Sequence, residues 1–307
     1  MKGLVIKSTG SWYQVLGDDG QIYECRVPGK FRTKGVESTN PIAVGDKVVW
    51  ELEPEQQTGI ITKLEDRENY IIRRSTNLSH QSQIIAANMD QAILVITLAQ
   101  PRTSLGFIDR FLVTAEAYHI PVILAFNKFD LYSDESLVVM RKYEALYTSL
   151  GYSCIELSGL TGFHLDELKQ IIKNKTSLFS GHSGVGKSTL INQLIPGLAL
   201  KTLSISDSSS KGKHSTTFAE MHPLPSGGFI IDTPGIKELG VVDIPKEEIA
   251  HYFPEIRAEL NNCKFHNCMH LEEPHCAVTD AVRAGKIAMS RYESYLSILS
   301  QGEERRR

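Results

Sequence analysis

The sequence predicts an α/β domain with a mostly parallel sheet, preceded by a small β-barrel and followed by a helical segment. Short strand-like segments fill residues 1–66, and apolar strands alternate with helices from residue 92 in the part that spans residues 67–240. Residues 241–307 have a helical pattern and contain three of the five cysteines. We therefore expect three domains with these boundaries, of which the middle one carries helices on both faces of its sheet.

Composition places the chain among proteins that bury sizeable cores. It has 307 residues, of which 41% are hydrophobic, and its net charge is −3. The longest apolar run, residues 92–99, is too short to cross a bilayer, and residues 1–7 lack the features of a signal peptide. A local basic cluster is formed by Arg26, Lys30, Arg32 and Lys34. We expect a cytoplasmic monomer that has no contact with membranes.

The first domain has the strand spacing of a small barrel. Strands are expected at residues 4–8, 12–16, 21–27, 46–52 and 59–64, with turns at 17–20 and 44–46. Five short strands in this length favour an OB-fold, which binds oligonucleotides on one face. A barrel with a purely structural role is the alternative, and the sequence favours neither.

The middle domain shows β/α alternation from residue 92 onwards. Strands are expected at 92–98, 121–126, 152–157, 176–180, 218–224 and 228–231, and helices at 106–118, 134–150 and 165–173. A further helix is expected to start near Lys187. Fully apolar strands between helices indicate a parallel sheet that is covered on both faces.

A phosphate-binding loop pattern, Gly-His-Ser-Gly-Val-Gly-Lys-Ser, lies between one of these strands and the helix that begins near Lys187. Its glycines let backbone N–H groups surround a phosphate at the positive end of the helix dipole. Lys187 is expected to stabilise the transferring phosphoryl group, and the Ser188 hydroxyl to bind Mg²⁺. The expected contacts are Gly181, His182, Ser183, Gly184, Val185, Gly186, Lys187, Ser188 and Thr189.

The tetrad Asn-Lys-Phe-Asp at residues 127–130 predicts recognition of guanine. The Asp130 carboxylate can accept hydrogen bonds from the N1–H and 2-amino groups of guanine, and adenine offers neither donor. Lys128 would lie along the ring, and Asn127 would connect loops. Ser158 stands where a weaker fifth motif is expected. The alternative is that this tetrad is an accidental match on the protein surface. We predict that the chain binds GTP and GDP.

The motif Asp-Thr-Pro-Gly at residues 232–235 follows the last strand of the sheet. Asp232 would hold Mg²⁺ through water, and the Gly235 N–H would contact the γ-phosphate. In the segment 204–217, Thr216 or Thr217 is expected to complete the Mg²⁺ shell when the γ-phosphate is present, and Thr216 is favoured.

The residue after Gly235 is an isoleucine, Ile236, which cannot orient an attacking water. His214 is the candidate for orienting the water. The expected catalytic residues are thus His214, Lys187 and Thr216. A solvated loop histidine is the alternative for His214.

The C-terminal cysteines have the spacing of a metal site. Three thiolates and one imidazole form a closed tetrahedral zinc set, with no open position for a reacting water. The predicted ligands of one structural zinc ion are Cys263, Cys268, His270 and Cys276. His266 or His275 could replace His270, and a disulfide would be the rival in a secreted protein.

The motif order, with the base-reading tetrad before the phosphate loop, the barrel and the Cys-x4-Cys-x-His-x5-Cys pattern together resemble the RsgA/YjeQ (also YloQ) family. These are circularly permuted bacterial GTPases that act in maturation of the small ribosomal subunit. The resemblance implies GTP hydrolysis that the subunit stimulates, with the barrel and zinc domain contacting ribosomal RNA. Ser215 replaces the first threonine of the family's Gly-x-His-Thr-Thr-Thr loop, which leaves the choice between Thr216 and Thr217 open.

Two other functions are compatible with parts of the sequence. A non-enzymatic RNA-binding adaptor could use the nucleotide only for stability, and measurable turnover on adding small subunits would decide against it. A P-loop kinase acting on a small molecule is disfavoured by the guanine-reading tetrad. The leading prediction is a regulatory GTPase that assists or checks late assembly of the small subunit.

Overall fold

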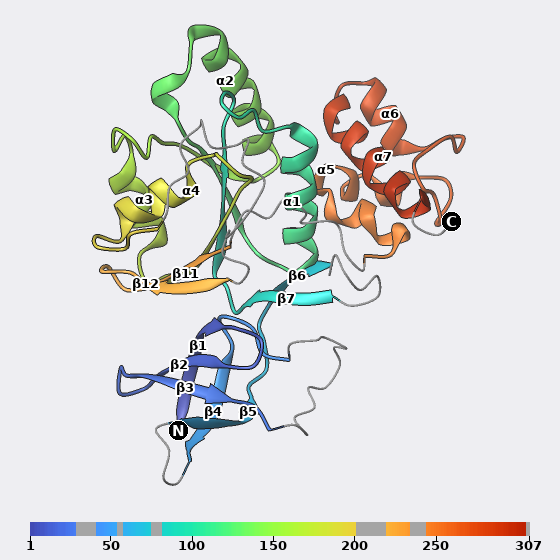
Figure 1. Ribbon diagram of the computed structural model, residues 1–307. Coiled ribbons are helices and arrows are strands. Elements are labelled where there is room, and N and C mark those ends of the chain that lie inside the picture. The colour runs from blue at the N-terminus through green and yellow to red at the C-terminus, as the bar shows by residue number, and fades with distance from the viewer. Residues whose placement is uncertain (29–40, 54–57, 75–81, 201–218, 234–243, 305–307) are drawn as a thin grey trace.

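The computed structural model describes residues 1–28, 41–53, 58–74, 82–200, 219–233 and 244–304. Figure 1 shows the N-terminal barrel below an α/β domain, with the C-terminal helices packed beside helix α1 (Leu105–Ala117). No helix in these ranges is both long and apolar enough to cross a membrane.

The first five strands close into a barrel. They are β1 (Lys2–Ser8), β2 (Tyr13–Gly17), β3 (Ile22–Arg26), β4 (Lys47–Leu52) and β5 (Gly59–Leu64). The strand order is β1-β2-β3-β5-β4, and pairing of β4 with β1 completes the ring. Alternate side chains, among them Val5, Tyr13 and Trp50, fill its interior. The predicted OB-like barrel is therefore confirmed.

The α/β domain contains the expected parallel sheet. Five parallel strands are ordered β10 (Ser153–Glu156), β9 (Val122–Phe126), β8 (Gln91–Ile96), β11 (Lys175–Ser180) and β13 (Gly228–Asp232), and β12 (Glu220–Pro223) pairs antiparallel to β13. The predicted fold class is confirmed, including the connection order of a permuted domain.

Helices cover both faces because β8 is apolar on both sides. Leu94 packs in one core with α1 and α2 (Asp134–Ser149), and its neighbour Val95 packs in the other core with α3 (Leu165–Ile172) and α4 (Lys187–Leu194). Successive residues of a strand point to opposite faces, so a continuous apolar run requires cover on both. Figure 1 shows α1 on one side of the sheet and α3 and α4 on the other.

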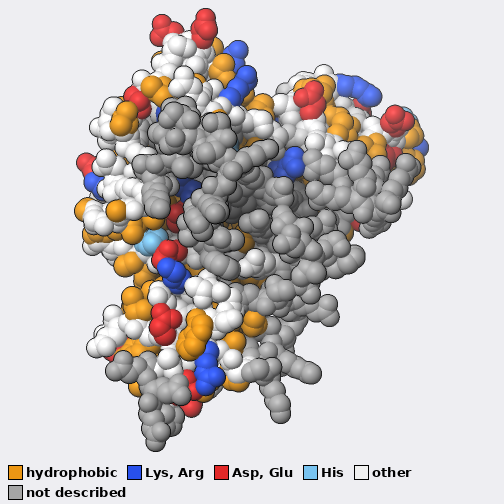
Figure 2. Space-filling view, viewed as in Figure 1, with side chains coloured by type: hydrophobic (Ala, Val, Ile, Leu, Met, Phe, Trp, Pro, Cys, Tyr) orange, Lys and Arg blue, Asp and Glu red, His pale blue; other side chains and the backbone are white. Residues whose placement is uncertain are grey.

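The barrel continues into the sheet through a short strand contact. β1 pairs antiparallel with β12, with Lys7 opposite Glu220, and their side chains form an ion pair at 2.9 Å. In the space-filling view, a basic and an acidic side chain adjoin where the barrel meets the sheet domain (Figure 2).

A two-stranded sheet lies between the two larger units and was not predicted. It consists of β6 (Tyr70–Arg74) and β7 (Ser82–Ala87). Ile71 and Ala86 are fully buried against the main core. The sequence analysis assigned no element here, because burial against distant segments stabilises this short pair of strands.

The C-terminal part is helical, as predicted. It contains the 3-10 helices η3 (Lys246–Tyr252) and η4 (Leu260–Asn262) and the helices α5 (Pro254–Arg257), α6 (Ala277–Arg283) and α7 (Met289–Glu304). Its apolar core also takes in Val113 of α1. The buried Arg291 guanidinium bonds Asp109 of α1 at 2.6 Å and Glu255 of α5 at 2.6 Å. The C-terminal helices are thus attached to α1 by apolar contacts and a buried charge network.

Candidate functional site

The predicted nucleotide-binding motifs meet at one edge of the sheet. The phosphate loop follows β11, residues 127–130 follow β9, Ser158 follows β10, and Asp232 ends β13. These four strands run parallel, so their carboxyl ends lie at the same edge, where α/β domains bind ligands. Motifs that are far apart in the sequence are brought together in this way.

At two positions of the phosphate loop the backbone has a positive φ angle and leaves no room for a side chain. Gly181 and Gly186 have φ angles of 154° and 90°. A Cβ atom at Gly181 would lie 2.5 Å from the Val95 carbonyl oxygen, and one at Gly186 would lie 2.4 Å from the Asn127 amide nitrogen. The glycines therefore allow the loop to pass close to β8 and to the base-reading loop.

Asn127 joins three loops at the centre of this site. Its side chain is 1% exposed. Its amide group donates to the Val185 carbonyl at 2.7 Å, and its oxygen accepts from the Gly159 N–H at 3.0 Å. The phosphate loop, the tetrad and the loop after β10 therefore form one hydrogen-bonded unit.

The side chains predicted to read the base lie beside this unit. The Ser158 hydroxyl donates to Asp130 Oδ1 at 2.5 Å, which orients the exposed carboxylate and leaves its second oxygen available. Lys128 has a left-handed backbone with φ of 62°, and its ammonium group donates to the Gln100 carbonyl at 2.5 Å. Burial lowers the pKa of Lys128.

Lys187 and Asp232 face each other across the phosphate loop. Lys187 is 8% exposed at the start of α4, and its ammonium group forms an ion pair with Asp232 Oδ1. Thr233 fixes the end of β13 by donating to the Phe179 carbonyl at 2.9 Å. A cationic group and a carboxylate, both predicted to contact the nucleotide or its metal, thus lie together at the start of α4 and the end of β13.

The other loop residues lie around this pair. Ser188 and Thr189 are half-buried in the first turn of α4, and Ser183 and Gly184 are exposed. The predicted residues His214, Thr216, Thr217, Gly235 and Ile236 lie outside the described residues, so their roles stay predictions.

His182 makes contacts that the sequence did not predict. Its Nε2 lies 2.7 Å from the Thr103 hydroxyl, and its ring meets Phe107 edge-on with centroids 5.5 Å apart. Thr103 and Phe107 flank the start of α1 and are far from His182 in the sequence, so no local pattern could have indicated the contact.

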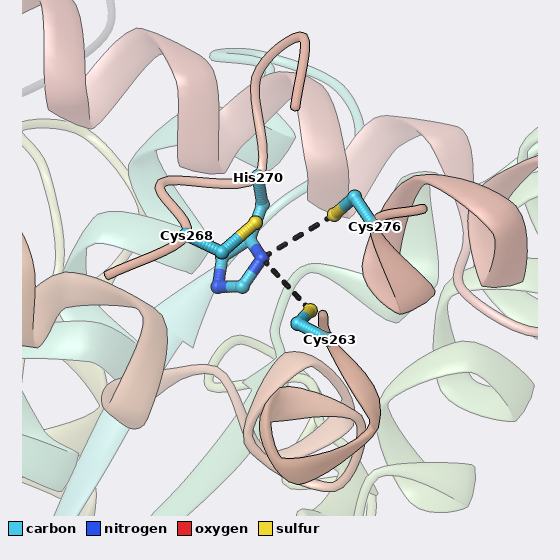
Figure 3. Close-up of side chains that lie close together, drawn as sticks. All are labelled: Cys263, Cys268, His270 and Cys276. Carbon is cyan, nitrogen blue, oxygen red and sulfur yellow. Dashed lines mark hydrogen bonds between the residues drawn. The ribbon is translucent and has the colours of Figure 1, made fainter. Parts of the chain in front are cut away.

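The four predicted metal ligands form one cluster. The ligand atoms of Cys263, Cys268, His270 and Cys276 all lie within 4.8 Å of one another (Figure 3). His270 Nδ1 is 3.6 Å from the Cys263 sulfur and 3.5 Å from the Cys276 sulfur. A tetrahedral ion with Zn–S of about 2.3 Å and Zn–N of about 2.0 Å separates such atoms by about 3.5 Å. The cluster can therefore hold a metal ion.

The surroundings of the cluster suit a cation. Burial raises the pKa of the Cys268 thiol to about 12, so a thiolate there needs a neighbouring positive charge at neutral pH. Burial also lowers the pKa of His270, which favours the neutral ring that a metal binds. All five cysteines of the chain are free thiols, and His270 is the histidine that joins this cluster rather than His266 or His275.

Hydrogen bonds fix the loop that carries His270. The Glu273 carboxylate accepts from the N–H groups of Met269 and Leu271 at 2.7 and 2.8 Å. Tyr292 of α7 donates to the His270 carbonyl at 2.6 Å. The cluster is therefore built onto the helix that also carries Arg291.

Comparison with known proteins agrees with this geometry. The family model described as RsgA GTPase matches residues 64–242, and the RsgA N-terminal domain model matches residues 2–61. The chain belongs to the RsgA GTPase family.

Curated relatives and solved structures match nearly the whole chain. The protein named small ribosomal subunit biogenesis GTPase RsgA from Bacteroides fragilis is 57% identical, with 99% of this chain and 98% of that protein covered. The protein of the same name from Christiangramia forsetii is 56% identical over 99% of this chain and 97% of that protein.

Two crystal structures, of proteins named YjeQ and YloQ, superpose on the chain. YjeQ from Thermotoga maritima gives a TM-score of 0.78 at 35% identity, covering 98% of this chain and 97% of that one. YloQ, described as a circularly permuted GTPase, gives 0.74 at 32% identity, covering 99% and 95%.

The role of Asn127 gives a first prediction. Asn127→Ala removes two buried hydrogen bonds, so the Kd for GTP and for GDP should rise about tenfold to hundredfold, which is about 1.4–2.8 kcal/mol. Titration with fluorescent guanine nucleotides measures this. Asn192→Ala is a matched control, because Asn192 of α4 also makes two bonds, both to the Leu200 backbone, outside the three loops. Equal effects of the two substitutions would contradict a specific role for Asn127.

Proposed function

We propose that this chain is a GTPase that binds the small ribosomal subunit and assists or checks its late maturation. The observation that carries the proposal is near full-length similarity to proteins named small ribosomal subunit biogenesis GTPase, combined with the loop unit built on Asn127. GTP is hydrolysed to GDP and phosphate, and the subunit stimulates the reaction.

The nucleotide is held by the residues at the carboxyl edge of the sheet. Lys187 binds the β- and γ-phosphates, Asp130 reads guanine, and the N–H of Gly235 contacts the γ-phosphate. Ser188, Thr216 and Asp232 would hold Mg²⁺, which would supply neutralisation of the phosphate charge. The Lys187–Asp232 ion pair supports these assignments. Phosphate would be a new partner for Lys187, and Mg²⁺ would be a new partner for Asp232.

Positioning of the attacking water is the step for which the isolated chain is least equipped. Ile236 cannot orient water, so His214 is proposed to do so when the subunit is bound. Because of the permutation, hydrolysis can affect the C-terminal domain: the chain that leaves Gly235 enters this domain after a few residues. Loss of the γ-phosphate would release Gly235 and change how that domain contacts RNA.

The ion in the cysteine cluster is proposed to be a single structural Zn²⁺. Three thiolates and one imidazole make a closed tetrahedral set, and the 3.5–3.6 Å sulfur–nitrogen distances support this choice. The barrel and this domain would contact ribosomal RNA, and the protein would act as a cytoplasmic monomer. The boundaries 1–66, 67–240 and 241–307 remain our proposed division into domains.

A non-enzymatic adaptor is the alternative function. It would need the same nucleotide site but no residue that orients water. GTPase assays with and without purified small subunits separate them directly, because an adaptor shows no turnover under either condition.

Base selection gives a second prediction. Asp130→Asn places a donor opposite the position of the guanine 2-amino group, so GTP affinity should fall and xanthosine triphosphate affinity should rise, each by about tenfold or more. Competition binding measures both. Unchanged affinities for GTP and ATP in this variant would exclude Asp130 as the base-reading residue.

Metal content gives a third prediction. The purified chain should contain about one zinc ion, and Cys263→Ala or Cys276→Ala should lose it, loosening the C-terminal domain while nucleotide binding persists. Cys154→Ala is the control, because this half-buried cysteine of β10 lies outside the cluster. Elemental analysis that finds no zinc in protein prepared without chelators would rule the assignment out.

Stimulated hydrolysis gives a fourth prediction. Small subunits should raise the slow turnover of the isolated chain by about a hundredfold or more, and His214→Ala should abolish this increase. The affinities of this variant for GTP and for the subunit should stay nearly unchanged, because His214 is proposed only to position the attacking water. Full stimulation of the variant would exclude His214 and assign water positioning to the ribosome.

A further inference from the structure

The segment before α1, residues 98–104, which we call the lead-in loop, touches both the base-reading loop and the phosphate loop. Lys128 donates to the Gln100 carbonyl at 2.5 Å. The Pro101 ring lies 3.3 Å from the position of a Cβ at Gly184. Thr103 contacts His182 at 2.7 Å. The lead-in loop therefore packs along the nucleotide site although it carries none of the sequence motifs.

Thr103 occupies the best-fixed position in this loop. It is 1% exposed, its N–H donates to the Thr97 carbonyl at 2.8 Å, and its hydroxyl oxygen accepts from the Thr97 N–H at 3.0 Å. The hydroxyl proton is then free to be donated to His182 Nε2. The hydroxyl thus connects the end of β8 to the phosphate loop.

The contacts of His182 select one neutral tautomer. His182 Nδ1 lies 3.2 Å from the Ser183 carbonyl oxygen, which can only accept a hydrogen bond. A proton on Nδ1 satisfies this contact and leaves Nε2 as the acceptor for Thr103. The Ser183–Gly184 peptide is thereby oriented, and its N–H is among those expected to face phosphate.

The opposite face of α1 is attached to the C-terminal domain. Phe107 meets His182, and two residues later Asp109 pairs with the buried Arg291 of α7. A separation of two residues corresponds to roughly 200° around a helix, so the two contacts lie on opposite sides. Tyr147 of α2 also donates to Asp109 at 2.7 Å, which fixes the carboxylate further.

We propose that Thr103 is a positioning residue for the GTPase reaction and that α1 couples the phosphate loop to the metal-binding domain. A change in the phosphate loop moves His182, then the lead-in loop and α1, and reaches α7 through Asp109. Coupling is reciprocal, so docking of the C-terminal domain on RNA would in turn adjust the phosphate loop. The effect of RNA docking on the phosphate loop rests on the proposed function, whereas the coupling between the phosphate loop and α7 does not.

Hydrogen exchange on the full chain tests the link without ribosomes. A non-hydrolysable GTP analogue with Mg²⁺ should slow exchange of the α7 amides at residues 289–300 by about fivefold in the wild type and in Thr103→Ser. Thr103→Val has nearly the same shape but lacks the hydroxyl, and it should lose this response while still binding the analogue. His182→Ala leaves the Thr97–Thr103 bonds intact and should also lose the slowed exchange of α7. This variant replaces Thr103→Val in the test if the valine variant fails to fold.

A kinetic measurement complements the exchange experiment. Thr103→Val should lower the subunit-stimulated kcat about tenfold, with KM changed much less, and Thr103→Ser should restore the rate. An α7 response that persists in both Thr103→Val and His182→Ala, or that is missing in the wild type, would overturn the proposal. A wild type that shows the response but no stimulation by subunits would contradict the proposed function and not this link.

Discussion

The parallel pairing of β10, β9, β8, β11 and β13 is the constraint on which the nucleotide site depends. Because parallel strands end at one edge, the loops that follow them meet there whatever the order in which the chain visits the strands. The motif order of a GTPase domain can therefore be permuted without moving the binding loops. What the permutation changes is the position of the chain ends, and so which domain is connected to which loop.

Side-chain contacts then convert neighbouring loops into a single site. Asn127 bonds the phosphate loop and the loop after β10, and Ser158 orients Asp130. The Lys187–Asp232 ion pair holds opposite charges close together, and both side chains are largely buried. Binding of nucleotide would replace this ion pair by two contacts, one between Lys187 and phosphate and one between Asp232 and Mg²⁺. Both charges would therefore have a partner with and without nucleotide.

The sequence predicted those features that depend on local pattern. The barrel strands, the apolar strands of the sheet and the Cys₃His spacing were recognisable because each is set by neighbouring residues. The β6–β7 hairpin was missed, since its stability comes from burial against distant segments. The Arg291–Asp109 and His182–Thr103 contacts join residues 182 and 79 positions apart, and no periodicity indicates such pairs.

The buried charge network limits how the C-terminal domain can move. Arg291 is fully buried and bonds Asp109 and Glu255, so pulling the domain away from α1 would leave charges partly buried and unpaired, at a cost of several kcal/mol. Sliding by a fraction of a side chain would break the same bonds without replacing them. The domain and α1 therefore move most easily as one body, so a change at the nucleotide would reach the C-terminal domain as a rotation of that body rather than as a detachment.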